Sequence, residues 1–177
     1  DAGTAYPSYK LQIVPVPADA PSPETYRHPK HGAPTKVWRY TDALDQLMFT
    51  VARFDFLDGD GNPAKDILPL TFCEIGKGRR AWRAKGIAGP RPLYRLPDIT
   101  ARTDAMLIVA EGEKSADASA ILFPDMVATT PPHGAKSPHK ADWTPVAGRT
   151  VIIATDNDDA GQQFGDKVCE LGRAAGA

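Results

Sequence analysis

The sequence predicts an α/β protein in which a parallel sheet flanked by helices follows a small β-rich subdomain and a proline-rich arm. Three observations lead to this prediction. Residues 1–36 hold seven prolines and show little periodicity, residues 37–100 alternate short apolar strands with turns, and from residue 101 apolar runs alternate with helical patterns. We therefore expect a linker or arm at 1–36, a basic subdomain at 37–100 and a sheet-and-helix domain at 101–177.

The expected strands of the subdomain are runs of aromatic and β-branched residues separated by polar turns. The runs lie at 37–40, 47–56, 69–75 and 79–84. The sequence DGDGN at 58–62 is expected to be a hairpin turn and not a calcium loop, because Pro63 stands where such a loop needs glycine. These runs predict antiparallel hairpins.

The C-terminal domain is predicted from three short apolar runs and two helical patterns. The apolar runs lie at 106–110, 126–130 and 151–155, and the helical patterns at 113–122 and 159–174. The order strand, helix, strand, loop, strand, helix predicts a parallel sheet with helices over its faces. We expect Trp143, in the long loop, to pack in the core.

The charge of the chain is unevenly distributed. The formal net charge is −1, from 21 basic and 22 acidic residues, which by itself argues against a nucleic-acid partner. Residues 76–95, however, hold 7 basic and no acidic side chains, together with Trp82 and Tyr94. Such a segment can hold phosphates and stack bases, and the alternative is a solvated surface hairpin. The candidates for nucleic-acid binding are Lys77, Arg79, Arg80, Trp82, Arg83 and Lys85.

The apolar runs, the cysteines and the start of the chain bear on where in the cell the protein is located. No apolar run approaches the ~20 residues that span a bilayer, so we expect no membrane association. Cys73 and Cys169 lie far apart and show no zinc-binding spacing, so a reducing cytoplasm is the expected location. The chain starts at Asp1 without a methionine or a signal peptide, and we expect it to be part of a longer protein.

Carboxylates follow two of the predicted strands directly. Glu111 comes after the run 106–110, and Asp156 and Asp158 come after the run 151–155. Functional groups gather outside the carboxyl ends of parallel strands, and a dication such as Mg²⁺ relieves the repulsion among three carboxylates. The alternative for each acid alone is a helix cap or a first-turn residue. Two clusters at matched positions favour a metal site.

These motifs resemble a Toprim domain, the catalytic fold shared by DnaG-type primases, topoisomerases, some nucleases and recombination proteins. The resemblance rests on Glu-Gly-Glu-Lys at 111–114 and Asp-Asn-Asp-Asp-Ala-Gly at 156–161. The preceding segment, with WRYTDALDQLMFTVARFDF and PRPLYRLPDI, resembles that of phage- and plasmid-type primases and primase-helicases. The resemblance covers residues 37–177.

The resemblance implies a role for each acidic residue. Glu111 matches the family's catalytic glutamate and Asp156 and Asp158 its metal-binding pair, while Asp159 is a further candidate ligand. Many members place an aspartate where this chain has Ser115, so the number of metals, one or two, is open.

The implied activity is that of a DNA primase from a phage, plasmid or other mobile element, synthesising RNA primers on a single-stranded DNA template. The 3′-hydroxyl of one nucleotide attacks the α-phosphate of the next and releases pyrophosphate, with Mg²⁺ or alternatively Mn²⁺ at the carboxylates. We expect Lys114, Arg91 and Lys136 to bind nucleotide phosphates. NTPs and a fused or separate replicative helicase are the other expected partners. A Toprim-family nuclease and a non-catalytic module that binds single-stranded DNA remain as alternatives.

Overall fold

The computed structural model of the chain describes residues 11–133 and 137–177. It divides into two compact units, of which the first runs to Arg39 and includes Leu47–Ala88, and the second comprises Tyr40–Gln46 and Gly89–Ala177. The boundary expected after residue 100 lies inside the second unit, because Leu93 and Ile99 belong to that unit's core. Among the described residues, no helix is long and apolar enough to cross a membrane.

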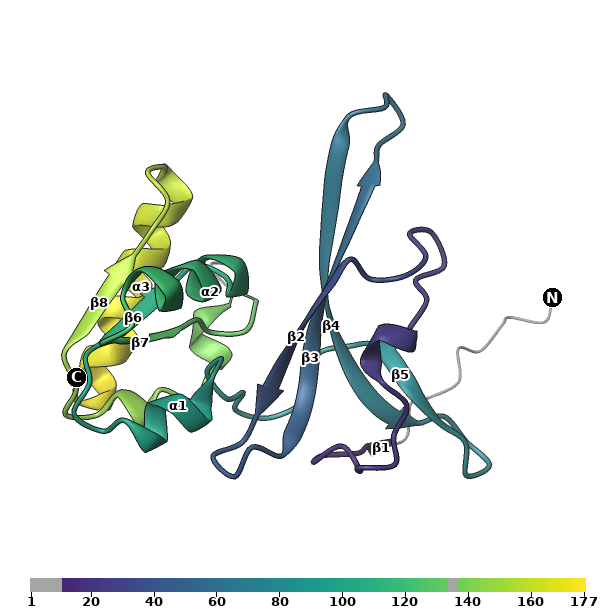
Figure 1. The fold of residues 1–177 in the computed structure, drawn as a ribbon, viewed down its shortest axis with the longest axis horizontal. Helices are drawn as coiled ribbons and strands as arrows, with labels where there is room; N and C mark the ends of the chain where they lie inside the picture. The colour runs from purple at the N-terminus through teal and green to yellow at the C-terminus, as the bar shows by residue number, and fades with distance from the viewer. Residues whose placement is uncertain (1–10, 134–136) are drawn as a thin grey trace. The chain divides into compact units, whose positions relative to one another are not determined.

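The first unit is built on a five-stranded sheet (Figure 1). Its central strand β4 pairs antiparallel with β3 over eight residue pairs, and with β1 and β5 near its C-terminal end, while β2 lies beyond β3. The strands are β1 (Leu11–Gln12), β2 (Lys36–Thr41), β3 (Leu47–Leu57), β4 (Pro63–Glu74) and β5 (Arg80–Ala84). The four runs predicted for this region are therefore strands, although β4 begins earlier than expected.

The turn between β3 and β4 is a hairpin turn, as its sequence predicted. The Asp58 carboxylate accepts the backbone N–H groups of Asp60 and Asn62, each at 2.9 Å. Gly61 adopts a left-handed conformation with φ of 81°, which favours glycine. The Asp58 carboxylate therefore stabilises the turn by accepting hydrogen bonds from its backbone.

The described part of the proline-rich arm packs on the sheet of the first unit. The backbone N–H of Ile13 donates to the carbonyl of Phe72 at 2.9 Å, and that of Val16 to the carbonyl of Leu47 at 2.6 Å. The side chains of Ile13, Val16 and Tyr26 pack against a core cluster that includes Phe54, Phe72 and Trp82. The arm therefore contacts the first unit through Ile13, Val16 and Tyr26.

The second unit contains a three-stranded parallel sheet with strand order β7-β6-β8. The strands are β6 (Leu107–Ala110), β7 (Val127–Thr129) and β8 (Val151–Ala154), and the helices are α1 (Leu96–Ala101), α2 (Glu113–Leu122) and α3 (Asp159–Ala175). Short 3₁₀ turns, η3 (Pro138–Lys140) and η4 (Thr144–Val146), lie in the loop before β8. The α/β class is confirmed, and α1 is the helix that the sequence pattern did not predict.

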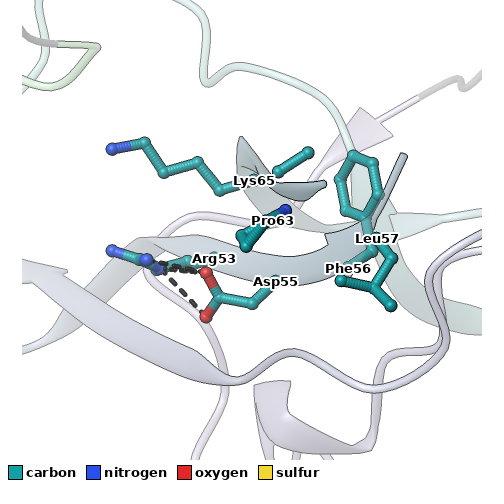
Figure 2. A pocket seen from close by; sticks show the side chains of 7 residues that line it. Arg53, Asp55, Phe56, Leu57, Pro63 and Lys65 are labelled. Carbon is teal, nitrogen blue, oxygen red and sulfur yellow. Dashed lines mark hydrogen bonds and ion pairs between the residues drawn. The ribbon is translucent and has the colours of Figure 1, made fainter. Parts of the chain in front are cut away.

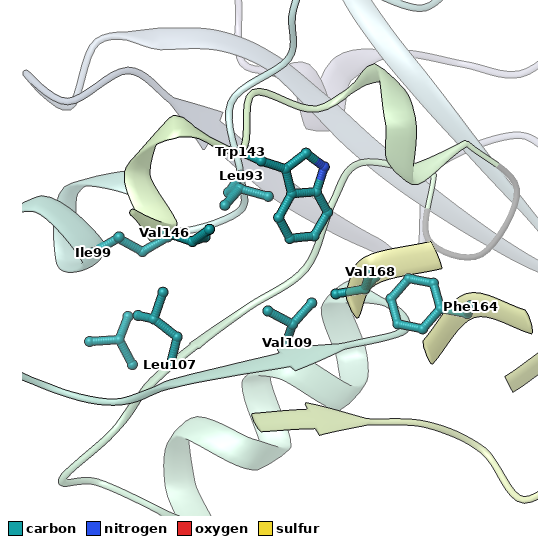
Figure 3. Close-up of a cluster of buried hydrophobic side chains, with 9 residues drawn as sticks. Leu93, Ile99, Leu107, Val109, Trp143, Val146, Phe164 and Val168 are labelled. Atoms are coloured by element: carbon teal, nitrogen blue, oxygen red, sulfur yellow. The ribbon is translucent and has the colours of Figure 1, made fainter. Parts of the chain in front are cut away.

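Alternate side chains of β6 point to opposite faces of this sheet. Figure 3 shows Val109 directed toward Phe164 and Val168 of α3, in a cluster that also holds Trp143. Residues of α2 contact β6 and β7. Trp143 is only 6% exposed and its indole N–H donates to the carbonyl of Pro138 at 2.9 Å, which confirms the prediction that it packs in the core.

Candidate functional site

Glu111 and Asp156 meet at one edge of the parallel sheet. They follow β6 and β8, which are neighbouring strands with Ala110 opposite Ala154. Parallel neighbours end at the same edge, so residues 45 positions apart in sequence come together there. The backbone N–H of Asp156 donates to Glu111 Oε1 at 2.8 Å. One carboxylate oxygen of Glu111 is therefore held by the segment that follows β8.

Gly161 in the first turn of α3 makes this approach sterically possible. A β-carbon at Gly161 would collide with the backbone oxygen of Asp156 and would lie 2.8 Å from Glu111 Oε1. Gly161 is buried, and its own backbone N–H donates to Asp158 Oδ1 at 2.7 Å. The glycine of the second motif therefore lies against both acidic segments.

Asp158 acts as the N-cap of α3, and Asp159 occupies the helix's first turn. These are the structural roles that the sequence left open for such acids, and the helix dipole favours both. Both side chains are exposed and stand at the same sheet edge as Asp156. Within residues 11–133 and 137–177, no three His, Cys, Asp or Glu side chains converge closely enough to hold a metal ion.

The residues predicted to bind phosphate differ in their exposure to solvent. Lys114 is exposed in the first turn of α2, three residues after Glu111. Arg91 is half-buried and burial lowers its pKa, while its backbone pairs with Lys140 and Asp142 across the loop before β8. Lys136 lies outside the described residues. Lys114 is thus the predicted cation nearest in sequence to the acids.

A buried pair of polar side chains that the sequence did not indicate lies beside the first motif. Glu113, two residues after Glu111, is only 7% exposed, and Tyr40 is fully buried. The Tyr40 hydroxyl donates to Glu113 Oε1 at 2.7 Å. Burial raises the pKa of Glu113, and the hydrogen bond from Tyr40 opposes that shift. Burial and then the charge of Glu113 raise the pKa of Tyr40 well above its usual value.

A second tyrosine–carboxylate pair extends this cluster. The Tyr94 hydroxyl donates to Asp117 Oδ1 at 3.0 Å, and the Tyr40 and Tyr94 rings lie 5.4 Å apart between centroids. Burial and then the charge of Asp117 raise the pKa of Tyr94. Asp117 stands one helical turn after Glu113, so both tyrosines fix the same face of α2. Asp117 is thus engaged by Tyr94, whereas Ser115 is exposed.

The basic residues of the 76–95 segment that belong to the first unit lie on β5 and its flanks. Lys77 and Arg79 are exposed in the turn before β5, Lys85 follows β5, and Arg80 pairs with Asp19 at 3.1 Å. Trp82 differs from its predicted role, because its ring is 3% exposed and contacts Phe72 inside the core. Its N–H donates to the carbonyl of Pro21, so the structure gives no support for base stacking by Trp82.

The long β3–β4 hairpin carries an open hollow of about 580 Å³. Figure 2 shows the Arg53 guanidinium hydrogen-bonded to the neighbouring Asp55 carboxylate on β3, with Leu57 and Lys65 also lining the hollow. Arg53 Nη2 lies 2.6 Å from Asp55 Oδ1, and this hydrogen-bonded pairing lowers the pKa of Asp55. The opposite charges of that pair compensate one another, so we do not take this hollow as the functional site.

No family model matches the sequence, and no curated protein is significantly similar to it. We therefore infer the function from the residues and their geometry.

Proposed function

We propose that the chain is the catalytic core of a Mg²⁺-dependent nucleotidyltransferase of the DNA primase class, with a Toprim-type second unit. The observation that supports this proposal most strongly is the contact of Glu111 with the backbone of Asp156 at 2.8 Å, at the carboxyl edge of a parallel sheet. Ligand sites of open α/β sheets lie at that edge. The exposed carboxylates of Asp156 and Asp158 stand at the same edge.

The chemistry of this donor set fits Mg²⁺. All the candidate ligands are carboxylate oxygens, which hard dications prefer, and Mg²⁺ commonly takes only one or two carboxylates and completes its shell with water and phosphate. The carboxylates of Glu111, Asp156 and Asp158 are the available ligands, of which one or two would bind the ion while water and phosphate complete its shell. Mg²⁺ at this place would lower the pKa of an attacking hydroxyl and offset the negative charge that develops on the phosphate.

The proposed reaction joins two nucleotides on a single-stranded DNA template. The 3′-hydroxyl of one nucleotide gives up its proton to water, and its oxygen forms a bond to the α-phosphorus of the next NTP. The bond from that phosphorus to the bridging oxygen breaks, and pyrophosphate leaves. Lys114 lies in the first turn of α2 and would bind the triphosphate. Its positive charge would offset the negative charge of the leaving pyrophosphate. The contact of Glu111 with the backbone of Asp156 would fix the position of an ion held by these carboxylates, and the ion would offset the repulsion between them and the phosphate.

A non-catalytic module that binds single-stranded DNA is the second candidate function. The Asp158 carboxylate already caps α3, and Ser115 stands exposed where many Toprim proteins have an acid. These two observations reduce the number of carboxylates that are committed to a metal. The module would retain the basic surface of the first unit and lack turnover.

Primer synthesis tests the proposal. The protein is incubated with single-stranded DNA, labelled NTPs and Mg²⁺, and products are resolved by gel electrophoresis. We expect short RNA products that Glu111→Gln and Asp156→Asn abolish, whereas Asp125→Asn, an exposed acid remote in sequence from both motifs, retains them. Primer yield that survives both substitutions would refute the assignment. Shortening of the DNA without NTPs would identify a nuclease instead.

A further inference from the structure

The proline-rich arm has a defined place beside β5. The indole N–H of Trp82 donates to the carbonyl of Pro21 at 2.7 Å. The Tyr26 ring meets Phe54 edge-on, with centroids 6.2 Å apart. The short 3₁₀ turn η1 (Pro23–Thr25) lies between these two anchors in the sequence. Arg27, which follows Tyr26 directly, is therefore positioned by packing.

Arg27 and Arg83 are each oriented by backbone carbonyls. Arg27 Nη1 donates to the carbonyls of Glu24 at 2.7 Å and Tyr26 at 2.9 Å. Arg83 Nη1 donates to the carbonyl of Trp82 at 3.0 Å. A guanidinium has five N–H donors, and these contacts engage one nitrogen of each side chain. Within the described residues, the Nε and Nη2 groups of both arginines remain for a ligand.

Arg27, Arg80 and Arg83 line one hollow of about 250 Å³, which Trp82 also lines. None of the described residues that line it is acidic. Arg80 pairs with Asp19 at 3.1 Å, but both side chains are substantially exposed, and pairs of that kind contribute ~0–1 kcal/mol to stability. The hollow is below the ~300 Å³ at which pockets for drug-sized ligands begin. Its size and charge therefore suit a single anionic group.

We propose that Arg27, Arg80 and Arg83 form a binding site for one backbone phosphate of single-stranded nucleic acid. Guanidinium groups bind phosphate oxygens in a bidentate manner, and two of the three are already oriented. The arm thereby contributes a residue, Arg27, to the basic surface of β5. This inference rests on the proposed function for its ligand, because a protein that copies single-stranded DNA must hold that strand by its phosphates.

Fluorescence anisotropy of a labelled oligo-dT, titrated with the 177-residue chain at several salt concentrations in EDTA, tests the site. We expect Arg27→Gln to weaken binding about tenfold, the effect of losing charge-assisted hydrogen bonds. The slope of log affinity against log salt should decrease by about 0.7 for the lost phosphate contact. A mixed-sequence oligonucleotide should show the same loss, because phosphates carry no sequence information.

Lys30→Gln is the matched control, since Lys30 is exposed on the same arm, does not line the hollow and loses the same charge. Circular dichroism verifies that each variant is folded, and Arg83→Gln, on β5, provides a second variant with the same expected effect. Equal losses in Arg27→Gln and Lys30→Gln, or no loss in either arginine variant, would overturn the site. Absence of DNA binding by the unsubstituted chain would also overturn it.

ATP is used as a competitor to distinguish the two sources of phosphate. We expect ATP to displace the oligonucleotide only weakly, and Arg27→Gln to leave ATP affinity unchanged. ATP binding that depends on Arg27 would mean that the hollow takes a nucleotide and would refute a backbone-phosphate site. The binding assay contains EDTA and no NTPs, so nucleotidyl transfer cannot occur in it. Failure of primer synthesis would therefore refute the proposed function, whereas failure of the Arg27→Gln effect on binding would refute the phosphate site.

Discussion

Substituting Gly161 by alanine perturbs the contact that joins the two acidic segments. The new β-carbon would collide with the backbone oxygen of Asp156 and lie 2.8 Å from Glu111 Oε1. A carbonyl oxygen cannot rotate away as a flexible side chain can, so α3 or the segment after β8 must shift. Overpacking of this kind costs ~1–3 kcal/mol, which exceeds the ~0.5–1 kcal/mol that alanine gains over glycine in a helix.

Gly172 provides the matched control for this substitution. It is a buried glycine of the same helix, and a β-carbon there would meet its nearest neighbour, Ala177 Cβ, at an ordinary 3.7 Å. We expect Gly172→Ala to raise the free energy of unfolding by ~0.5–1 kcal/mol. Gly161→Ala should lower it by ~0.5–2 kcal/mol, the steric cost less the helical gain.

The assay is guanidinium denaturation followed by circular dichroism, together with a measurement of primer synthesis. A shift of roughly 1 Å between Glu111 and Asp156 should reduce the rate about 100-fold in Gly161→Ala, because catalytic groups are sensitive to displacements of that size. Gly172→Ala should retain the full rate. If Gly161→Ala is as stable and as active as Gly172→Ala, the close packing of Gly161 against both acidic segments is wrong.

The remaining predictions concern the tyrosine–carboxylate cluster. Tyr40→Phe leaves the buried Glu113 carboxylate without its donor and should lower the free energy of unfolding at pH 7 by ~1–3 kcal/mol, whereas Glu113→Gln keeps an acceptor for Tyr40 and should cost less. Equal losses in chemical denaturation would contradict this. The raised pKa of Tyr40 means that its contribution to stability is complete below the unfolded-state pKa of ~10 and is lost at higher pH. Between pH 10 and 11 the unsubstituted chain should therefore lose ~1 kcal/mol more stability than Tyr40→Phe, and parallel pH profiles would refute it.

Hydrophobic patterning was sufficient to predict most elements of the second unit. The runs at 106–110 and 151–155 are nearly continuous apolar segments, and they form β6, which is fully buried, and β8, an edge strand that is only partly buried. The helix α1 was missed because its six residues, LPDITA, are too few to show a helical period. Its packing through Ile99 also explains why the unit begins before residue 101.

Sequence could predict some contacts of the candidate site but not others. Glu111 and Asp156 could be placed together from sequence because each directly follows a predicted parallel strand. The bond between Tyr40 and Glu113 could not, because the two residues are 73 positions apart and neither strand nor helix pattern pairs them. Trp82 was misplaced because an aromatic residue among arginines suggests a surface, whereas its ring is 3% exposed and packs against Phe72 in the core.

Amide NMR of the chain titrated with Mn²⁺ tests most directly whether Glu111, Asp156 and Asp158 form a cation site. The paramagnetic ion broadens nearby resonances, so the amides of residues 111–114 and 156–161 should broaden first, and excess Mg²⁺ should reverse the effect. Glu111→Gln should abolish this pattern, whereas Asp125→Asn should leave it unchanged. Broadening that is absent from these residues, or that persists in Glu111→Gln, would contradict the proposed metal site and the catalytic function that depends on it.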